Sequence, residues 1–270
     1  TPMNSRPVET VAVLGAGAMG GMYAAHFAAA GLRTLLVARG ERAHRLRASG
    51  LTVNGVALAA DVVDVDDLGG QDRPVADLVI VAVKDRQLAA ALDDVTPLVG
   101  GHTTFLSVLN GLDSEDEIAA RFGAESVLPC IALAMDAMRD GASISYRQVG
   151  RLVFGTRSPE HPTDRLAAVQ AVLTRAGLAW HTPEDMRHEM WWKFMVNVGI
   201  NQASAILRAP YGAFVDDGPA RSLMLALQGE VIAVGAAEGV PLGPTDLDRW
   251  QQVLAAQPAD GWTSMHQDVE

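Results

Sequence analysis

Three polar residues interrupt an almost wholly apolar stretch at Trp191–Ile206, and their types and spacing could support chemistry. Lys193, Asn197 and Asn201 follow one another at intervals of four residues. On an α-helix each step of four passes a full turn by only about 40°, so the three side chains form one polar stripe. A helix that is apolar on its other faces is usually buried, and a buried lysine is costly unless a partner pairs with it or a reaction uses it.

The stripe has two interpretations. The structural one, which the stretch taken alone favours, is a polar seam that hydrogen-bonds a neighbouring helix. The functional one is a catalytic lysine at Lys193, with the two amides aligned beside it. The elements around the stretch have to decide between them.

A glycine fingerprint follows the first apolar run of the chain, Val11–Leu14, and precedes an alanine-rich helix and a second run at Thr34–Val37. A GxGxxG inside such a βαβ unit indicates dinucleotide binding. Gly15 permits the tight turn, Gly17 lets a pyrophosphate approach the backbone, and Gly20 lets helix and strand pack closely. The helix N-terminus donates N–H groups to the phosphates. We expect cofactor contacts along the whole fingerprint, Gly15, Ala16, Gly17, Ala18, Met19 and Gly20.

The end of the second strand predicts which nucleotide binds. An acidic residue there would accept hydrogen bonds from the ribose hydroxyls of NAD and repel a 2′-phosphate. This chain has Arg39, nineteen residues beyond Gly20, with Arg42 close behind. We therefore expect NADP(H), although the neighbouring Glu41 favours NAD.

Two further strands end in polar residues. Asp77–Val83 is a continuous apolar strand that ends at Lys84, and Thr103–Leu109 ends at Asn110. Open α/β sheets bind ligands at the carboxyl edge of their strands, so Lys84 and Asn110 are candidate cofactor ligands. Gln87, one turn into the next helix, is a third.

The remaining patterns complete an α/β domain. Asn54-Gly55 predicts a tight hairpin, and Gly150 suggests a hairpin that closes the sheet. The other expected elements are strands at Val127–Met135, Ser143–Arg147, Leu152–Phe154 and Leu178–His181, and a helix at Pro162–Ala176. Thr182 is a candidate N-cap for a helix with Pro183 in its first position.

Strand signals disappear after Pro183, where we place the domain boundary. Helices are expected through Ile206, at Pro219–Glu238, and after Pro244. The chain therefore predicts an α/β N-terminal Rossmann-type dinucleotide-binding domain at residues 1–182, followed by an all-α C-terminal domain at residues 183–270.

Charge and hydropathy limit the classes of partner that the protein is expected to bind. The 270-residue chain has a formal net charge of −11 and no basic run, which argues against nucleic acid or an anionic membrane. We see no stretch of about 18 apolar residues that could cross a membrane and no signal pattern before the first strand. A soluble cytoplasmic protein is expected.

Metal and hydrolytic chemistry find little support. The single cysteine, Cys130, lies in an apolar run and predicts an inert buried thiol. His188-Glu189 begins like a zinc-binding HExxH, but Trp192 stands where the second histidine is required. No serine lies in a GxSxG elbow. We expect no metal.

With these residues identified, the chain resembles the ketopantoate reductase (2-dehydropantoate 2-reductase) family from Val11 to its last residue. The matching elements are the glycine fingerprint, Arg39, the VAVK run ending at Lys84, the LNG run with Asn110, the WxKxxxNxxxN pattern of Trp191–Asn201, and Ser-Met-x-x-Asp at Ser264–Asp268. Their combination, in this order and spacing, is far more specific than the fingerprint alone.

The resemblance implies an NADPH-dependent reduction of 2-dehydropantoate to pantoate, for pantothenate and coenzyme A synthesis. It also implies a C-terminal domain like that of 6-phosphogluconate dehydrogenase. Lys193 would be the general acid, Asn110, Asn197 and Asn201 would hold substrate or nicotinamide, and Ser264 would bind the substrate carboxylate. The expected partner is a small-molecule 2-keto acid, with a homodimer as the candidate assembly.

The chain departs from the family pattern in three places. Gln202 stands where proline is usual, and Tyr211 where an asparagine often lies near substrate. The family's active-site glutamate lies in a helix beyond the position of Glu270, so we expect the chain to lack a C-terminal segment. Tyr211 would narrow or reshape the pocket and so bears on which 2-keto acid is used.

Two alternatives stay open. The first is a related 2-keto acid reductase or a β-hydroxyacid dehydrogenase, because families of the latter also place a lysine four residues before an asparagine on this helix. The second is a catalytically weak NADP-binding paralogue. The presence of both Lys193 and Ser264 argues against the second.

Overall fold

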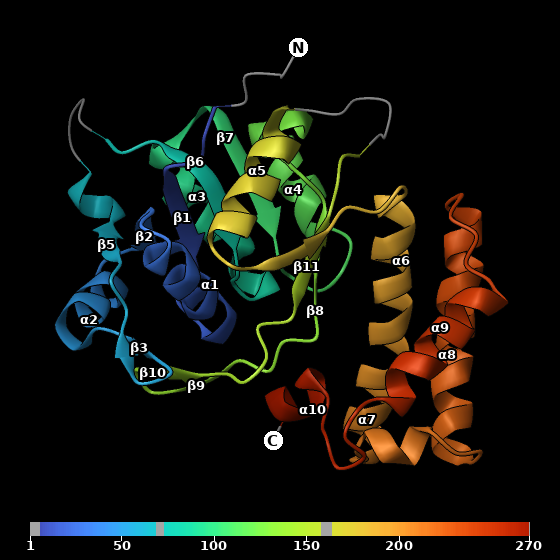
Figure 1. Ribbon diagram of the computed structural model, residues 1–270. Helices are drawn as coiled ribbons and strands as arrows, with labels where there is room; N and C mark the ends of the chain where they lie inside the picture. The colour runs from blue at the N-terminus through green and yellow to red at the C-terminus, as the bar shows by residue number, and fades with distance from the viewer. Residues whose placement is uncertain (1–5, 69–72, 158–163, 270) are drawn as a thin grey trace. The chain divides into compact units, whose positions relative to one another are not determined.

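The computed structural model describes residues 6–68, 73–157 and 164–269, and the chain divides into two compact units (Figure 1). The sheet unit comprises the chain up to Leu109 together with Asp113–Met186. The helical unit comprises Asn110–Leu112 and the chain from Arg187 onward. Each unit is described below by itself.

A parallel five-stranded sheet forms the centre of the sheet unit, in the order β5-β2-β1-β6-β7. The strands are β1 (Thr10–Leu14), β2 (Arg33–Ala38), β5 (Asp61–Asp64), β6 (Ala76–Val81) and β7 (Val99–Ser107). The chain builds outward from β1 through β2 to β5, then returns to the other side of β1 with β6. Such a reversal of strand order opens a crevice at the carboxyl ends of the strands, where open α/β sheets bind their ligands. The expected Rossmann-type fold is confirmed.

Helices cover both faces of this sheet: α1 (Ala18–Ala29), α2 (Glu41–Ser49), α3 (Leu88–Val95), α4 (Ser114–Phe122) and α5 (Asp164–Arg175). Alternate residues of β1 belong to different cores, as the two-residue strand period requires. Val11 and Val13 pack in one cluster with Phe27 of α1, whereas Leu14 packs in the other with Leu88 of α3. Burial on both faces explains why these strands are continuous apolar runs. Pro162, the expected start of α5, lies outside the described residues.

Two smaller sheets complete the unit, and one prediction about them is wrong. The expected partners Ser143–Arg147 and Leu152–Phe154 lie in different sheets, β4-β3-β10-β9 and β12-β11-β8. Their strands are β3 (Thr52–Val53), β4 (Val56–Ala57), β8 (Cys130–Leu133), β9 (Met138–Asp140), β10 (Ser143–Ser145), β11 (Arg151–Phe154) and β12 (Ala179–His181).

Two glycines explain the different pairing. Gly141, with φ +55°, makes the turn that joins β9 to β10. Gly150, with φ +69°, lies so close to β8 that a Cβ there would be 2.1 Å from the Leu133 carbonyl oxygen. The strand that follows Gly150, β11, therefore pairs with β8 and not with β10. The predicted Asn54-Gly55 hairpin is confirmed, because both residues have positive φ and join antiparallel β3 and β4.

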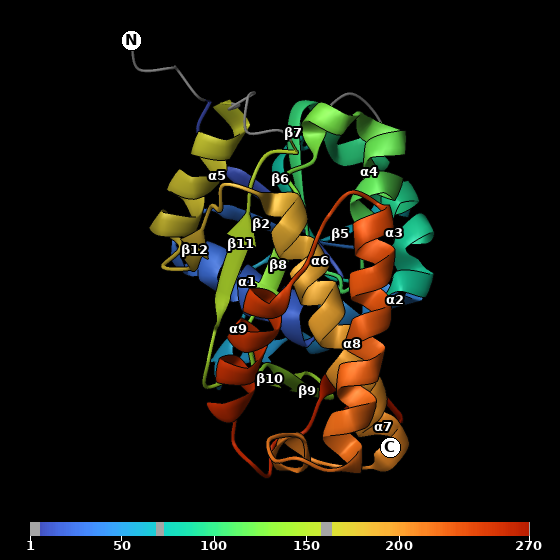
Figure 2. The same ribbon diagram turned by 90° about the vertical axis from the view of Figure 1, so that its right-hand side faces the viewer.

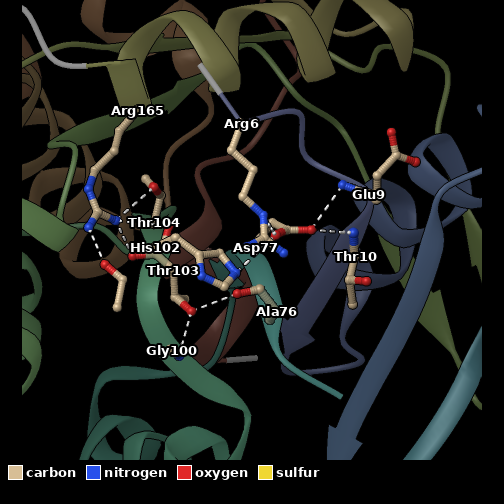
Figure 3. Close-up of polar contacts among 11 residues, drawn as sticks. Arg6, Glu9, Thr10, Ala76, Asp77, Gly100, His102, Thr103, Thr104 and Arg165 are labelled. Carbon is tan, nitrogen blue, oxygen red and sulfur yellow. Dashed lines mark hydrogen bonds and ion pairs between the residues drawn. The ribbon is translucent and has the colours of Figure 1, made fainter. Parts of the chain in front are cut away.

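Polar contacts align the elements at the amino edge of the main sheet (Figure 3). The buried Asp77 carboxylate accepts hydrogen bonds from the Glu9 and Thr10 N–H groups at 3.0 and 2.9 Å, and lies 3.4 Å from Arg6 Nε. The guanidinium of Arg165 donates to the carbonyl oxygens of three successive residues, Gly101, His102 and Thr103. Asp77 thus joins the start of β1 to β6, and Arg165 joins α5 to β7.

The helical unit contains α6 (Met186–Val196), η5 (Asn197–Asn201), α7 (Gln202–Leu207), η6 (Tyr211–Phe214), α8 (Pro219–Ala237), α9 (Pro244–Ala255) and α10 (Ser264–Val269). Figure 2 shows α6 and α9 side by side. Trp192 of α6 donates through Nε1 to the Asp246 carbonyl oxygen of α9 at 3.1 Å, and its ring lies under the Arg249 guanidinium. Glu189 and Arg249 form a bidentate ion pair at 2.7 and 2.9 Å. The expected all-α character of this unit is confirmed.

The first helix of this unit differs from expectation at its start. It begins at Met186 instead of Pro183. The Thr182 hydroxyl accepts a hydrogen bond from Gln170 Nε2 of α5 at 3.1 Å, so it is used within the sheet unit and does not cap the helix.

One helix bears on the expectation that no stretch of about 18 apolar residues could cross a membrane. By length and composition alone, α8 could cross a membrane: it has 19 residues and a mean hydropathy of 1.2 over its most apolar window. The criterion is weak, because a core helix of a soluble protein meets it too. Met224 and Val231 of α8 are buried, and the helix also carries Arg221 and Glu230.

Candidate active site

The glycine fingerprint has the geometry that each glycine was predicted to provide. Gly15 has φ +95°, and a Cβ there would lie 2.5 Å from the Ala82 carbonyl oxygen. A Cβ on Gly20 would lie 1.9 Å from the Gly15 carbonyl oxygen. A Cβ on Gly17 would meet no atom within 4 Å. Gly15 and Gly20 are thus required for packing, whereas Gly17 leaves open space at the start of α1.

The start of α1 suits a phosphate group. Gly17 is the N-cap and makes no side-chain capping bond, and no acidic residue lies in the first turn. The first N–H groups of a helix, here those of Ala18, Met19 and Gly20, have no partner within the helix and carry partial positive charge. A dinucleotide's diphosphate therefore fits both the open side of Gly17 and these donors.

A pocket of about 280 Å³ opens at the carboxyl ends of β1 and β2. Three predicted cofactor ligands, Gly15, Arg39 and Gln87, line it. Arg42, noted beside Arg39 in the sequence, also lines it, together with Arg86 and Asp94, which sequence reasoning missed. Arg86 could have been identified in the sequence because it directly precedes Gln87, but no local sequence pattern pointed to Asp94.

The other predicted cofactor ligands lie outside this pocket's lining: Ala16, Gly17, Ala18, Met19 and Gly20 of the fingerprint, and Lys84 and Asn110. Lys84 is exposed and precedes η2 (Asp85–Gln87), where its N–H lies 3.4 Å from the Gln87 Oε1 acceptor. Asn110 belongs to the helical unit.

Arg39 is held by two carboxylates. Its Nε donates to Asp94 Oδ1 at 2.7 Å, and its Nη1 donates to Asp66 Oδ1 at 2.5 Å. The hydrogen bond to Asp94 is the main cause that raises the pKa of the Arg39 guanidinium. Asp64 fixes the adjoining turns by accepting from the Gly40 and Asp66 N–H groups at 3.1 and 3.2 Å. Burial of Asp64 opposes its ionisation, but these two hydrogen bonds and the nearby charges of Arg47 and His44 together outweigh it and lower the pKa of the carboxyl.

Lys193 lies on α6 of the helical unit, in the third turn of the helix. Burial lowers the pKa of its ammonium from 10.5 to about 8. Desolvation disfavours the charged form, so the ammonium gives up its proton more readily than an exposed lysine would. Such a shift is typical of lysines that take part in proton transfer.

The polar stripe continues into a π-helical turn, η5, and not into a regular α-helix. A step of four overshoots an α-helical turn, but the π-helix closes its hydrogen bonds at i→i+5 and holds more residues per turn. The drift from Lys193 to Asn197 is thereby offset between Asn197 and Asn201. Gly199 makes this turn fit against α8, because a Cβ there would lie 2.5 Å from Cγ of the fully buried Gln228.

Asn110 and Asn197 meet within the helical unit. Asn197 Nδ2 donates to Asn110 Oδ1 at 3.1 Å, although the residues are 87 positions apart. Two residues that were predicted to hold the same ligands are thus brought together. Asn201, four residues on, ends the π-helical turn.

Ser264 is the exposed first residue of α10, a helix that packs against η5 and α7. Tyr211 and its neighbour hold the segment before it. The Tyr211 N–H donates to the Gly261 carbonyl oxygen at 2.9 Å, and the Gly212 N–H donates to Ala259 at 2.9 Å. Burial raises the pKa of the Tyr211 phenol. Tyr211 therefore helps to place the segment that carries Ser264.

The discounted motifs have structural explanations. Cys130 is buried, and burial raises the pKa of its thiol well above the ordinary value. His188 Nε2 lies 2.8 Å from Asp246 Oδ1 on α9. Across residues 6–68, 73–157 and 164–269 there is no group of three or more His, Cys, Asp or Glu side chains that could hold a metal ion.

Comparison with known proteins identifies relatives of both units. The model of the ketopantoate reductase PanE/ApbA family matches residues 11–159, and that of its C-terminal part matches residues 185–270. The 2-dehydropantoate 2-reductase of Mesorhizobium japonicum is 28% identical, over 96% of this chain and 85% of its own length.

Solved structures agree. A putative ketopantoate reductase from Ralstonia solanacearum MolK2 superposes with a TM-score of 0.82 at 27% identity, over 96% of this chain and 86% of that one. A D-mandelate dehydrogenase solved with NADH and anilino(oxo)acetate shares the fold, with a TM-score of 0.82 at 23% identity, over 96% of this chain and 85% of its own.

A Rossmann-type unit with this fingerprint, followed by a helical unit of this kind, defines a class of nicotinamide-dependent oxidoreductases that act on a CH–OH group. The chain belongs to the ketopantoate reductase PanE/ApbA family.

Substitution of Gly20 and of Gly17 should have different effects on stability. We expect Gly20→Ala to lower the free energy of unfolding by about 2 kcal/mol or more, because its Cβ would overlap a backbone oxygen that cannot move aside. Gly17→Ala, at φ −79° with open space around it, should change that energy by less than about 0.5 kcal/mol. Urea unfolding followed by circular dichroism measures both, and equal losses would contradict the geometry.

Proposed function

We propose that the protein reduces 2-dehydropantoate (ketopantoate) to pantoate with NADPH, in the synthesis of pantothenate and coenzyme A. The observation that carries the proposal is Lys193, with its lowered pKa, one helical turn ahead of the Asn197–Asn110 hydrogen bond. The match of both family models supports it. We also propose a cytoplasmic location and a homodimer, in keeping with the family resemblance.

The sheet unit holds the nucleotide in this proposal. The N–H groups at the start of α1 bind the diphosphate beside Gly17. Arg39 binds the 2′-phosphate, and Gln87 and Lys84 bind nearby parts of the nucleotide. When bound, NADPH supplies the hydride.

Lys193 supplies the proton. As the keto carbon of the substrate gains hydride, its C=O bond becomes a C–O single bond and negative charge grows on the oxygen. The ammonium of Lys193 stabilises that charge and transfers a proton to the oxygen, which gives the alcohol. The neutral amine then regains a proton from water. A pKa near 8 lets the group both donate and recover a proton near neutral pH.

Asn110, Asn197, Asn201 and Ser264 orient the substrate. Amide and hydroxyl groups donate to carboxylate and hydroxyl oxygens without a net charge of their own, so the lysine remains the dominant cation beside the reacting carbonyl. The Asn110–Asn197 hydrogen bond fixes one amide orientation, and Ser264 is assigned to the substrate carboxylate.

A related 2-keto acid reductase is the second candidate. Tyr211, a half-buried phenol where the family pattern often has asparagine, favours it, because the larger ring changes the room beside the segment that carries Ser264. The D-mandelate dehydrogenase of the same fold was solved with NADH, so the fold alone decides neither substrate nor nucleotide.

A substrate panel tests the proposal. Consumption of NADPH and of NADH would be followed by absorbance with ketopantoate and with branched, aromatic and straight-chain 2-keto acids, and the reverse reaction with β-hydroxy acids. We expect kcat/KM to be highest for ketopantoate with NADPH, by at least about tenfold. Preference for an aromatic 2-keto acid would favour the second candidate. Preference for a β-hydroxy acid with NAD would overturn both. Tight NADPH binding without turnover would indicate a non-enzymatic paralogue.

Substitution of Lys193 tests its role as the acid. Lys193→Ala should lower kcat by a factor of about 100 or more, with the Kd for NADPH unchanged. Lys193→Arg keeps the positive charge but cannot release a proton, so it should be nearly as slow. In the wild type, kcat for ketone reduction should fall as the pH rises through about 8, because only the ammonium can donate. Near-normal turnover in Lys193→Ala would remove the assignment.

Substitution of Arg39 tests the nucleotide. Arg39→Ala should raise the KM for NADPH about tenfold or more and leave the KM for NADH nearly unchanged, because only NADPH carries the 2′-phosphate. The exposed Arg33 of β2, which lies 3.9 Å from Asp61, is a suitable control as Arg33→Ala. Equal effects of Arg39→Ala on the two nucleotides would exclude the 2′-phosphate contact.

A further inference from the structure

Two carboxylates already occupy the guanidinium that is assigned to the 2′-phosphate. Asp94 of α3 binds Arg39 Nε, and Asp66, of η1 (Val65–Asp67), binds Arg39 Nη1. The Asp94 side chain is 23% exposed and lines the same pocket as Arg39, whereas Asp66 is 53% exposed and is not part of its lining. Asp94 is therefore the acid that an entering nucleotide would meet.

The pocket's charges act in opposite directions. Arg39, Arg42 and Arg86 line it and attract a phosphate, whereas Asp94 lines it and repels one. A 2′-phosphate must displace the Asp94 carboxylate from Arg39 or bind beside it against like-charge repulsion. A 2′-hydroxyl meets neither penalty, and it can donate a hydrogen bond to a carboxylate.

We propose that Asp94 competes with the 2′-phosphate for Arg39 and so sets the selectivity of this pocket between NADPH and NADH. The proposal rests on the nucleotide-binding part of the proposed function and deepens it. Asp94 is a specificity-determining residue that acts through Arg39: it weakens NADPH binding relative to NADH, while the three arginines favour NADPH. Specificity then depends on a repulsive element as well as an attractive one.

The neighbouring residue provides a matched control. Asp93 precedes Asp94 on α3 and also pairs with an arginine, but its partner is Arg121 of α4. Asp93 does not line the pocket. Asp93→Asn and Asp94→Asn therefore remove the same charge from the same helix and each break one ion pair, but only the second changes Arg39.

The test measures the Kd of the full chain for NADPH and for NADH, without any keto acid, by titration calorimetry. We expect Asp94→Asn to lower the Kd for NADPH about fivefold and to leave that for NADH within about twofold, since an exposed ion pair and one screened charge are each worth little. Asp93→Asn should leave the ratio of the two constants within about twofold. Asp94→Glu should retain most of the wild-type ratio.

A double variant shows whether Asp94 acts through Arg39. In an Arg39→Ala background, Asp94→Asn should change the ratio of the two constants by less than about twofold, because the shared partner is gone. The proposal is overturned if Asp93→Asn and Asp94→Asn change the ratio equally, or if the effect of Asp94→Asn persists without Arg39.

A failure of this proposal can be distinguished from a failure of the proposed function. If the wild type binds NADH more tightly than NADPH, the choice of NADPH is wrong, but a shift of the ratio toward NADPH in Asp94→Asn still supports competition at Arg39. If NADPH binds more tightly and Asp94→Asn leaves the ratio unchanged, the competition is wrong and the choice of NADPH stands. Because no turnover is measured, the identity of the keto acid affects neither result.

Discussion

The rest of the sheet unit depends on the contact between two backbone segments at the first turn. A Cβ on Gly20 would overlap the Gly15 carbonyl oxygen, and a Cβ on Gly15 would overlap that of Ala82. Only glycine at both positions lets α1 begin directly at the carboxyl ends of β1 and β6. The turn then exposes the helix N-terminus at the crevice where strand order reverses, and Gly15 and Arg39 line one pocket there. The geometry that is proposed to bind phosphate is therefore a consequence of close packing, and Gly17 alone contributes open space to it.

Around this turn the chain concentrates positive charge that it lacks overall. Its net charge is −11, yet three arginines line the pocket beside the fingerprint. A cluster of that sign attracts an anion locally although the distant field is repulsive, because charges beyond about one Debye length are screened. Asp66 and Asp94 hold Arg39 in a defined position, so the cluster combines attraction with order. A phosphate bound in this pocket would have to share Arg39 with these two carboxylates.

Local sequence patterns predicted most of the fold. The features that depend on contacts between residues far apart in the sequence were not predicted. The strands β1, β2, β6 and β7 of the main sheet, the fingerprint and the helices α8 and α9 follow from apolar runs, glycines and prolines that act within a few residues. The edge strand β5 was not predicted. The separation of β10 from β11 depends on Gly150 approaching the distant Leu133. The Asp94–Arg39 and Asn197–Asn110 contacts join residues 55 and 87 positions apart, and no local signal marks either pair. Spacing placed Lys193, Asn197 and Asn201 on one face, but it gave no sign of the π-helical turn, which Gly199 and Gln228 of α8 make together.

The use of arginine at position 39 of the sheet unit and of lysine at position 193 of the helical unit supports different roles for the two units. Lys84 and Lys193 are the only lysines in a chain with 21 lysines and arginines, so arginine is its ordinary cation. Arginine suits binding and ion pairing, because its guanidinium stays charged and offers several fixed donors. A group that must release and recover a proton cannot be arginine. Lysine at 193, buried enough to bring its pKa to about 8, meets that requirement, whereas arginine at 39, with its pKa raised by Asp94, meets the requirement for permanent charge. Proton affinity is thus lowered at Lys193 and raised at Arg39, as the proposed roles in proton donation and phosphate binding each require.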